Sequence, residues 1–317
     1  MGRKIIRTID NIENTVIFFV VLLAAAFAAY AIWDSEQMYK TAGKSNYTVY
    51  KPDAVSEGKS FRELQAVNAE VIAWLSVYGT NIDYPVAQAE DNMKYVNTNA
   101  EGLYSLSGSI FLDSANAGDF SDFINLVYGH YMEKNAMFGD IGGFSDKAVF
   151  ESHRYGNLYF GGKDHGIEFF AFLHADAYDD SVLTVKVKEE KRAEYLEGLF
   201  QKALYERDVR IKETERLVLL VTCSANSTNG RDILAGRITD DVFPDPFLYP
   251  ETNNAAGHAA GHAAGHAEGI QSAHVKAVFP WPLLVLIVAI RLITPAVSSL
   301  LRSIPSIPRK KANEVLL

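Results

Sequence analysis

The single cysteine of this 317-residue chain, Cys223, is the residue whose side chain has the most distinctive chemistry. A thiolate is a nucleophile, and a neighbouring imidazolium or guanidinium favours the thiolate over the thiol. One cysteine can form neither an intrachain disulfide nor a thiolate metal site. Taken alone, a lone cysteine is more often a small buried hydrophobic residue. Its interpretation therefore depends on the partners that the chain brings to it.

The histidine best placed to act with the cysteine is His130. It follows the apolar run Ile124–Tyr128 and a glycine, so it lies where a predicted strand gives way to a loop. Rigid scaffolds present reactive groups at such positions. Ordinary surface or core roles suffice for His153, His165 and His174, and the remaining four histidines lie in or near a low-complexity segment close to the C-terminus.

An arginine, Arg231, follows Cys223 by eight positions. The interval is rich in Ser, Asn, Thr and Gly, which predicts a loop between two strands. Such a loop returns Arg231 to the level of Cys223 on an adjacent strand, where a fixed guanidinium can donate to a developing oxyanion. Arg237 is the competitor, on the same strand face but about 20 Å further along. The alternative for both arginines is a solvated charge at a strand edge.

The elements that must position these three side chains are short runs of β-type residues between turn residues. The pattern predicts strands at 71–78, 82–86, 109–113, 123–128, 159–160, 168–175, 184–187, 217–222 and 233–238. Many short strands at this spacing are typical of a β-barrel or sandwich. A capping-box spacing predicts a helix from Ser60 to near Asn68, and apolar residues at 3.6 spacing predict an amphipathic helix over 189–206.

Apolar segments lie on both sides of this region. Val16–Trp33 carries no charge, follows three basic residues, and has the length needed to cross about 30 Å of hydrocarbon as a helix. The positive-inside rule then places the N-terminus in the cytoplasm and the following residues outside; a cleaved signal peptide is the alternative. Residues 278–301 predict a second crossing, although Arg291 and Pro295 leave an interfacial segment as the alternative.

The chain accordingly divides into five predicted segments. They are a basic cytoplasmic end with a transmembrane anchor (1–33), an extracellular stalk (34–59), a catalytic domain (60–249), a Gly/His/Ala-rich tether (250–276), and a second transmembrane segment with a basic cytoplasmic tail (277–317). Small-residue repeats cannot build a core, so the tether is interpreted as a linker rather than as a metal site. The net charge of −9 argues against nucleic acid as a partner.

Several motifs, in one collinear order from about Phe61 to Ile238, resemble sortases. Leu219-Leu220-Val221-Thr222-Cys223 looks like the sortase signature Thr-Leu-X-Thr-Cys, with Leu219 in place of the first Thr. Tyr128-Gly129-His130, followed by Met137-Phe138-Gly139-Asp140, resembles the histidine region of class B sortases. Segments 79–86 and 107–113 are also similar to that class. Each motif is weak alone, and their shared order makes the resemblance specific.

The resemblance implies a mainly β fold with helices. We expect an eight-stranded sortase β-barrel with an N-terminal helix and a long helix before the cysteine strand, flanked by transmembrane segments. It also implies a membrane-anchored cysteine transpeptidase of a Gram-positive cell, with the catalytic domain extracellular. The expected partners are secreted proteins that carry a C-terminal sorting signal. No metal or organic cofactor is implied.

The resemblance further assigns roles to residues. Cys223 would attack the carbonyl after Thr of the sorting signal, and an amine of a cell-wall precursor would resolve the thioacyl enzyme. His130 would act as general acid and then base, and Arg231 would hold the oxyanion. Thr222, Ser224 and Asn125 are expected to contact the substrate.

Three alternatives remain open at this point. A C-terminal span resembles class C sortases, so a pilin lysine is a possible acceptor instead of a wall peptide. A thiol peptidase would use water with the same residues. In a non-catalytic, membrane-tethered binding module, Cys223 would be a buried hydrophobic residue.

Overall fold

The computed structural model describes residues 2–52, 59–224 and 229–248. The Gly/His/Ala-rich tether and the second apolar segment lie outside the described residues. The chain divides into two compact units, and the one that contains the candidate site comprises Asp34–Ala255.

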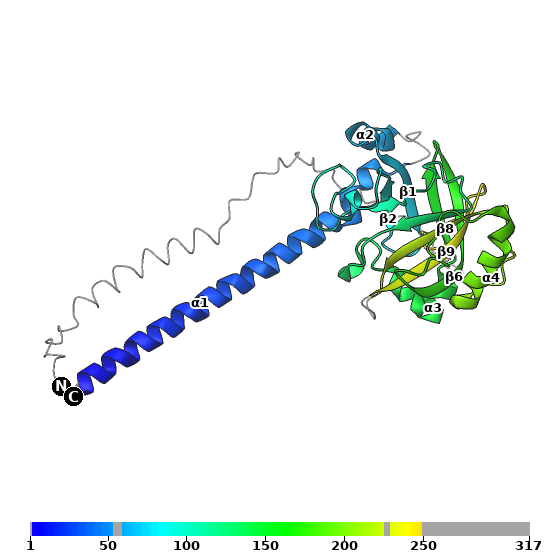
Figure 1. Ribbon diagram of the computed structural model, residues 1–317. Helices are drawn as coiled ribbons and strands as arrows, with labels where there is room; N and C mark the ends of the chain where they lie inside the picture. The colour runs from blue at the N-terminus through cyan, green and yellow to red at the C-terminus, as the bar shows by residue number, and fades with distance from the viewer. Residues whose placement is uncertain (1, 53–58, 225–228, 249–317) are drawn as a thin grey trace, which may run out of the picture. The chain divides into compact units, whose positions relative to one another are not determined.

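Eight strands close into a β-barrel, as the sequence predicts (Figure 1). The ring runs β5 (Tyr155–Phe160), β1 (Val71–Val77), β2 (Asp83–Ala87), β3 (Ile110–Leu112), β4 (Ile124–Tyr128), β8 (Arg216–Cys223), β9 (Gly230–Thr239) and β6 (Lys163–Asp176). Antiparallel pairing of β5 with β6 closes the ring, and β7 (Ala203–Glu206) adds to the free part of β6. The strands β2 and β3, and likewise β4 and β8, are parallel neighbours.

Alternation along the strands separates the core into two layers. On β8, Val218 and Leu220 belong to the large cluster that fills the barrel, whereas Leu217, Leu219 and Val221 belong to a second cluster on the opposite face. This second cluster contains apolar residues of α4, so the helix covers the outer face of β8 and β9. Successive strand residues point to opposite faces, and this explains the continuous apolar run before the cysteine.

The described residues form four α-helices: α1 (Gly2–Ala42), α2 (Lys59–Val67), α3 (Lys147–Ser152) and α4 (Arg192–Lys202). Short 3-10 helices occupy Lys44–Asn46, Thr48–Tyr50, Lys94–Val96, Glu133–Asn135, Ile141–Ser145 and Glu189–Lys191. The helix predicted from Ser60 is confirmed as α2. Within α1, Asp10–Ala42 is long and apolar enough to cross a membrane, and it is the one such helix among the residues that the structure describes.

Two predicted elements differ from the structure between β6 and β8. The helix predicted over 189–206 ends at Lys202, because Ala203–Glu206 instead pairs with β6 as β7. The strand predicted at 184–187 is wrong: this segment is irregular, and Val185 and Val187 pack against the outer cluster without a β-partner of their own. In both places, packing against β6 and the outer cluster overrides the local pattern.

Part of the segment predicted as a stalk, 34–59, packs on the barrel. Ala42 and Tyr47 are buried in the core, and the Tyr84 hydroxyl donates to the Ala42 carbonyl at 3.1 Å. Further along, Lys134 forms an ion pair with Glu36 at 2.5 Å. Met38, Tyr39 and Tyr50 also pack against the core, whereas Val49 is 67% exposed.

Candidate active site

The register of three neighbouring strands brings His130, Cys223 and Arg231 into one row. On the antiparallel pair β8–β9, Cys223 lies directly opposite Arg231. On the parallel pair β4–β8, Tyr128 lies opposite Val221, and the Gly129 amide extends this ladder by donating to the Val221 carbonyl at 3.2 Å. His130 follows Tyr128 by two residues, and Cys223 follows Val221 by two residues. Because neighbouring strands lie about 4.8 Å apart, the register places His130 and Arg231 on the two sides of Cys223.

The same alternation places the three side chains on one face of the sheet. Leu126 on β4, Val221 on β8 and Ile233 on β9 all belong to the outer cluster beneath α4. On each strand, an even number of positions separates the cluster residue from the row residue: Leu126 from His130, Val221 from Cys223, and Ile233 from Arg231. The three row residues therefore lie on the same outer face, beyond the end of the cluster. Cys223 is exposed there. The sulfur is accessible, and the interpretation of Cys223 as a buried hydrophobic residue is not supported.

His130 is oriented by a backbone carbonyl. Its Nε2 lies 2.7 Å from the carbonyl oxygen of Val96, in the 3-10 helix Lys94–Val96. A carbonyl oxygen can only accept, so Nε2 carries the proton in this contact. In the neutral ring, Nδ1 is then the nitrogen that can accept a proton. No feature of the sequence around Val96 indicates this contact, because it joins residues 34 positions apart.

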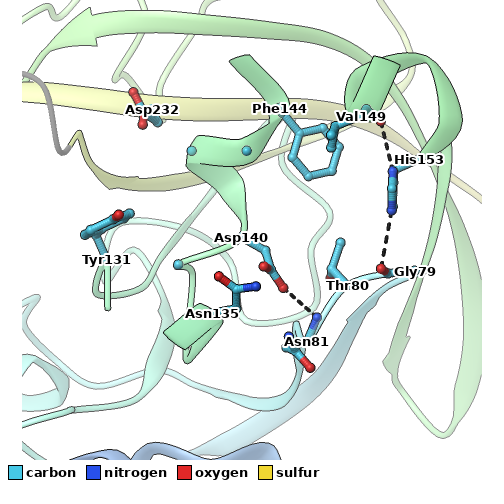
Figure 2. Close-up of a pocket in the computed structure, with 13 residues that line it drawn as sticks. Gly79, Thr80, Asn81, Tyr131, Asn135, Asp140, Phe144, Val149, His153 and Asp232 are labelled. Atoms are coloured by element: carbon cyan, nitrogen blue, oxygen red, sulfur yellow. Dashed lines mark hydrogen bonds between the residues drawn. The ribbon is translucent and has the colours of Figure 1, made fainter. Parts of the chain in front are cut away.

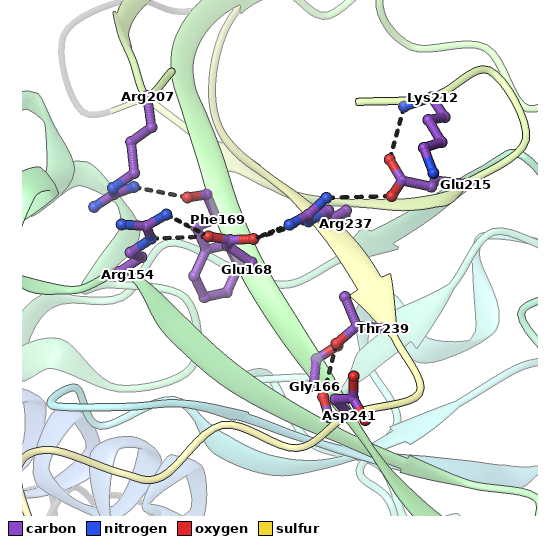
Figure 3. Close-up of polar contacts among 10 residues, drawn as sticks. All are labelled: Arg154, Gly166, Glu168, Phe169, Arg207, Lys212, Glu215, Arg237, Thr239 and Asp241. Carbon is purple, nitrogen blue, oxygen red and sulfur yellow. Dashed lines mark hydrogen bonds and ion pairs between the residues drawn. The ribbon is translucent and has the colours of Figure 1, made fainter. Parts of the chain in front are cut away.

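The two candidate arginines lie in different settings. Arg231 is half-buried in the row and donates to the carbonyl of its neighbour Gly230 at 3.0 Å. Arg237 instead donates to Glu168 at 2.8 and 2.6 Å and to Glu215 at 3.2 Å (Figure 3). It lies near the opposite end of β9, opposite Leu217. Carboxylates therefore already engage Arg237, away from the cysteine.

Glu168 is the centre of this second cluster. Its side chain is 5% exposed and accepts from both Arg154 and Arg237. Burial raises the pKa of Glu168, but the hydrogen bonds and charges of the two guanidinium groups outweigh burial, so its pKa lies below the ordinary value. The cluster joins β6, β9 and the residue before β5, and this geometry indicates a structural role.

The residues expected to contact the substrate are placed differently from one another. Asn125 is fully buried, and its Nδ2 donates to the Leu217 carbonyl at 2.9 Å, so it joins β4 to β8 within the core. The contact of Asn125 with a substrate stays a prediction, and in this structure the side chain bonds within the core. Thr222 also points into the barrel, and its hydroxyl has no hydrogen-bond partner among the described residues. Ser224 is half-buried and borders a pocket of about 530 Å³ beside the row, together with Ala175 and Gly230.

A second pocket of about 520 Å³ lies on the other face of β9 (Figure 2). Tyr131 and Asp232, the residues after His130 and Arg231, both contribute to its lining. Asp232 is buried and accepts from His174 at 2.8 Å, a pair that the sequence did not indicate. His153 lies between the carbonyls of Val149 and Gly79, which agrees with its expected ordinary role. Among the described residues, no group of three or more His, Cys, Asp or Glu side chains is arranged to hold a metal ion.

Comparison with known proteins identifies the class to which this barrel and site belong. No protein-family model matches the chain. It is 28% identical over 198 residues to sortase B of Listeria monocytogenes, which covers 60% of the chain and 80% of that relative. Among solved structures, sortase B from the type II pilus of Streptococcus pneumoniae is 40% identical, with a TM-score of 0.50, covering 56% of the chain and 98% of that structure.

A class B sortase of Streptococcus pyogenes involved in pilus biogenesis is 39% identical, with a TM-score of 0.53, covering 57% of the chain and 99% of that structure. A closed eight-stranded barrel with this cysteine strand is thus a sortase fold, and the site is that of a cysteine transpeptidase. The chain belongs to the class B sortases.

Proposed function

We propose that this sortase is a membrane-anchored transpeptidase that cleaves the C-terminal sorting signal of secreted proteins after Thr and transfers the acyl group to an amine. The observation that carries the proposal is the row His130–Cys223–Arg231 across β4, β8 and β9. The exposed thiol of Cys223 has an imidazole on one side and a guanidinium on the other. This is the arrangement that nucleophilic acyl transfer requires.

The first half-reaction forms a thioester. The Cys223 sulfur attacks the carbonyl carbon after Thr, the C–N bond breaks, and the leaving amine takes a proton from His130. Because the Val96 carbonyl accepts from Nε2, the transferred proton is carried on Nδ1 of the imidazolium. Arg231 donates to the carbonyl oxygen as negative charge develops there. In the second half-reaction, neutral Nδ1 accepts a proton from the incoming amine, and the thiolate leaves.

The acceptor is proposed to be an amine of a cell-wall precursor. A pilin lysine is the second candidate, and a specific observation favours it: the two solved structures at 39% and 40% identity are sortases of pilus assembly. Both acceptors present a primary amine to the same thioester. The helix Asp10–Ala42 supports an anchor that holds the enzyme at the outer surface of the membrane.

The experiment uses the full chain in nanodiscs with peptides copied from the region before the C-terminal apolar tails of secreted proteins of the same genome. Mass spectrometry should detect a thioacyl adduct on Cys223 that is absent from Cys223→Ala. Adding an oligoglycine wall-type amine, or a lysine-containing pilin peptide, should convert the adduct to an amide and reveal which acceptor reacts faster. Hydrolysis that neither amine diverts would indicate a peptidase instead. Anchored product in cells that express Cys223→Ala would support a binding module.

A further inference from the structure

The loop between β2 and β3 has an inverted distribution of polar and apolar side chains. Ser105, Ser107 and Ser109 are buried, whereas three apolar side chains of the same loop are exposed. The exposed residues are Leu103 (57%), Tyr104 (75%) and Leu106 (62%). Residues 102–112 carry no charge, in a chain with 22% charged residues. Exposed apolar side chains that gather within four residues indicate a contact surface rather than isolated surface positions.

The inversion is fixed by the backbone and by the buried serines. Ser105 and Ser107 share a hydrogen bond of 2.8 Å, and the Ser109 hydroxyl donates to the Thr98 carbonyl at 3.0 Å. Gly108 adopts φ +57°, and a Cβ there would lie 2.4 Å from the Tyr95 carbonyl oxygen. The loop is thus held against the 3-10 helix Lys94–Val96, and its leucines and tyrosine cannot turn inward without breaking these contacts.

The apolar loop adjoins the catalytic row. Leu106 borders a pocket of about 420 Å³ together with His130 and Tyr131. Met38 and Tyr39, from the end of α1, line the same pocket. The 3-10 helix that supports the loop also supplies the carbonyl that orients His130. A surface that engages the loop therefore lies beside the reacting atoms.

We propose that Leu103, Tyr104 and Leu106 insert into the surface of the lipid bilayer and hold the catalytic row beside it. Met38, next to the loop, follows Trp33 at the end of the apolar span by five residues. Five residues reach at most about 18 Å in any conformation, so an anchored chain keeps the loop near the bilayer. Uncharged leucine and tyrosine side chains are suited to the interface. The inference rests on the proposed membrane anchor.

The test measures depth in the bilayer with the full chain in vesicles of phosphatidylcholine and phosphatidylglycerol. In a Cys223→Ser background, an environment-sensitive fluorophore is attached to Tyr104→Cys or Leu106→Cys. The control is Val242→Cys, whose native side chain is 51% exposed and follows the far end of β9. Lipids with a nitroxide near the headgroup should quench positions 104 and 106 more strongly than position 242, because interfacial side chains lie about 5–10 Å deep.

A second measurement distinguishes insertion of the loop into the bilayer from binding of the substrate by the loop. The double variant Leu103→Ser/Tyr104→Ser should raise KM about tenfold for a lipid-coupled sorting peptide in the same vesicles, since apolar burial of two side chains is lost. Turnover of the soluble peptide should stay unchanged. An equal loss on the soluble peptide would mean that the loop binds substrate and would overturn the inference.

Flotation and quenching together distinguish failure of the proposed membrane anchor from failure of the proposed loop insertion. A chain that does not co-float with the vesicles refutes the anchor, and this inference with it. A chain that co-floats while positions 104 and 106 are quenched no more than position 242 refutes this inference alone.

Discussion

Replacing each of the two β9 arginines by alanine should have opposite effects on activity and stability. Arg231 lies opposite Cys223, and among the described residues its side chain makes one hydrogen bond, to the Gly230 carbonyl. Loss of a single oxyanion donor lowers turnover by about 10²–10³. The lost hydrogen bond costs only about 1 kcal/mol. Arg231→Ala should therefore be nearly inactive and close to native in stability.

Arg237→Ala should be active and unstable. Its side chain is 25% exposed and pairs with Glu168, which is 5% exposed. Removing one partner of a buried ion pair costs about 3–5 kcal/mol, and because Arg154 remains bonded to Glu168 we take the lower end, about 3 kcal/mol. For a unit of this size each kcal/mol lowers Tm by about 2–4 °C, so a fall of about 6–12 °C is expected.

The assay pairs the single-turnover rate of thioacyl formation with thermal unfolding of the same preparations. Rates are measured well below the lower Tm, so that unfolding does not contribute to the loss of activity. Comparable losses of rate in both variants, at unchanged Tm for Arg237→Ala, would show that Arg237 acts at the site and would refute the assignment of Arg231.

Three further predictions concern Glu168, His130 and Gly108. Glu168→Gln should lower Tm at neutral pH. The folded-state pKa of Glu168 lies below its ordinary value of 4.5, so the difference in Tm from wild type should persist above pH 4.5 and shrink as the pH falls through the folded-state pKa. Thermal unfolding at several pH values measures this difference. His130→Ala should abolish thioacyl formation while lowering the free energy of unfolding by no more than the loss of one hydrogen bond, about 1 kcal/mol. A loss of stability as large as that of a core truncation would contradict a catalytic role. Gly108→Ala should destabilise the fold by more than Gly102→Ala, because both glycines have positive φ but only the Cβ at 108 would collide with backbone; equal Tm values would show that the loop yields.

Much of the barrel and the central row could be predicted from the sequence, because the signals are local. The apolar run that ends at Cys223 and the Ser/Asn/Thr/Gly-rich interval before Arg231 define a β-hairpin by themselves, and β8 pairs with β9 accordingly. The predicted strand at 159–160 is too short, since β5 begins at Tyr155. Gly156 and Asn157 disfavour a strand locally, and pairing with β1 and β6 on both sides stabilises it.

The remaining differences depend on contacts between distant residues. Asn125 resembles a functional polar residue within an apolar run, but its amide donates to the nearby Asp122 carbonyl and to the Leu217 carbonyl 92 residues later. A local sequence pattern likewise does not predict the carbonyl that orients His130. Nor does it predict the buried serines that leave the apolar side chains of the β2–β3 loop exposed. Composition likewise could not show that Ala42 and Tyr47 belong to the core.

The parallel pairing of β4 with β8 also determines when the enzyme can become active. These strands join residues 92 positions apart, so their contact closes a long loop and forms late in folding. His130 follows β4, Cys223 ends β8, and Arg231 lies on β9, the next strand along the chain. A partly folded chain in which β4, β8 and β9 are not yet paired therefore has the Cys223 thiol without its imidazole and guanidinium neighbours. The row of side chains on which the proposed acyl transfer depends is complete only once β9 is paired with β8.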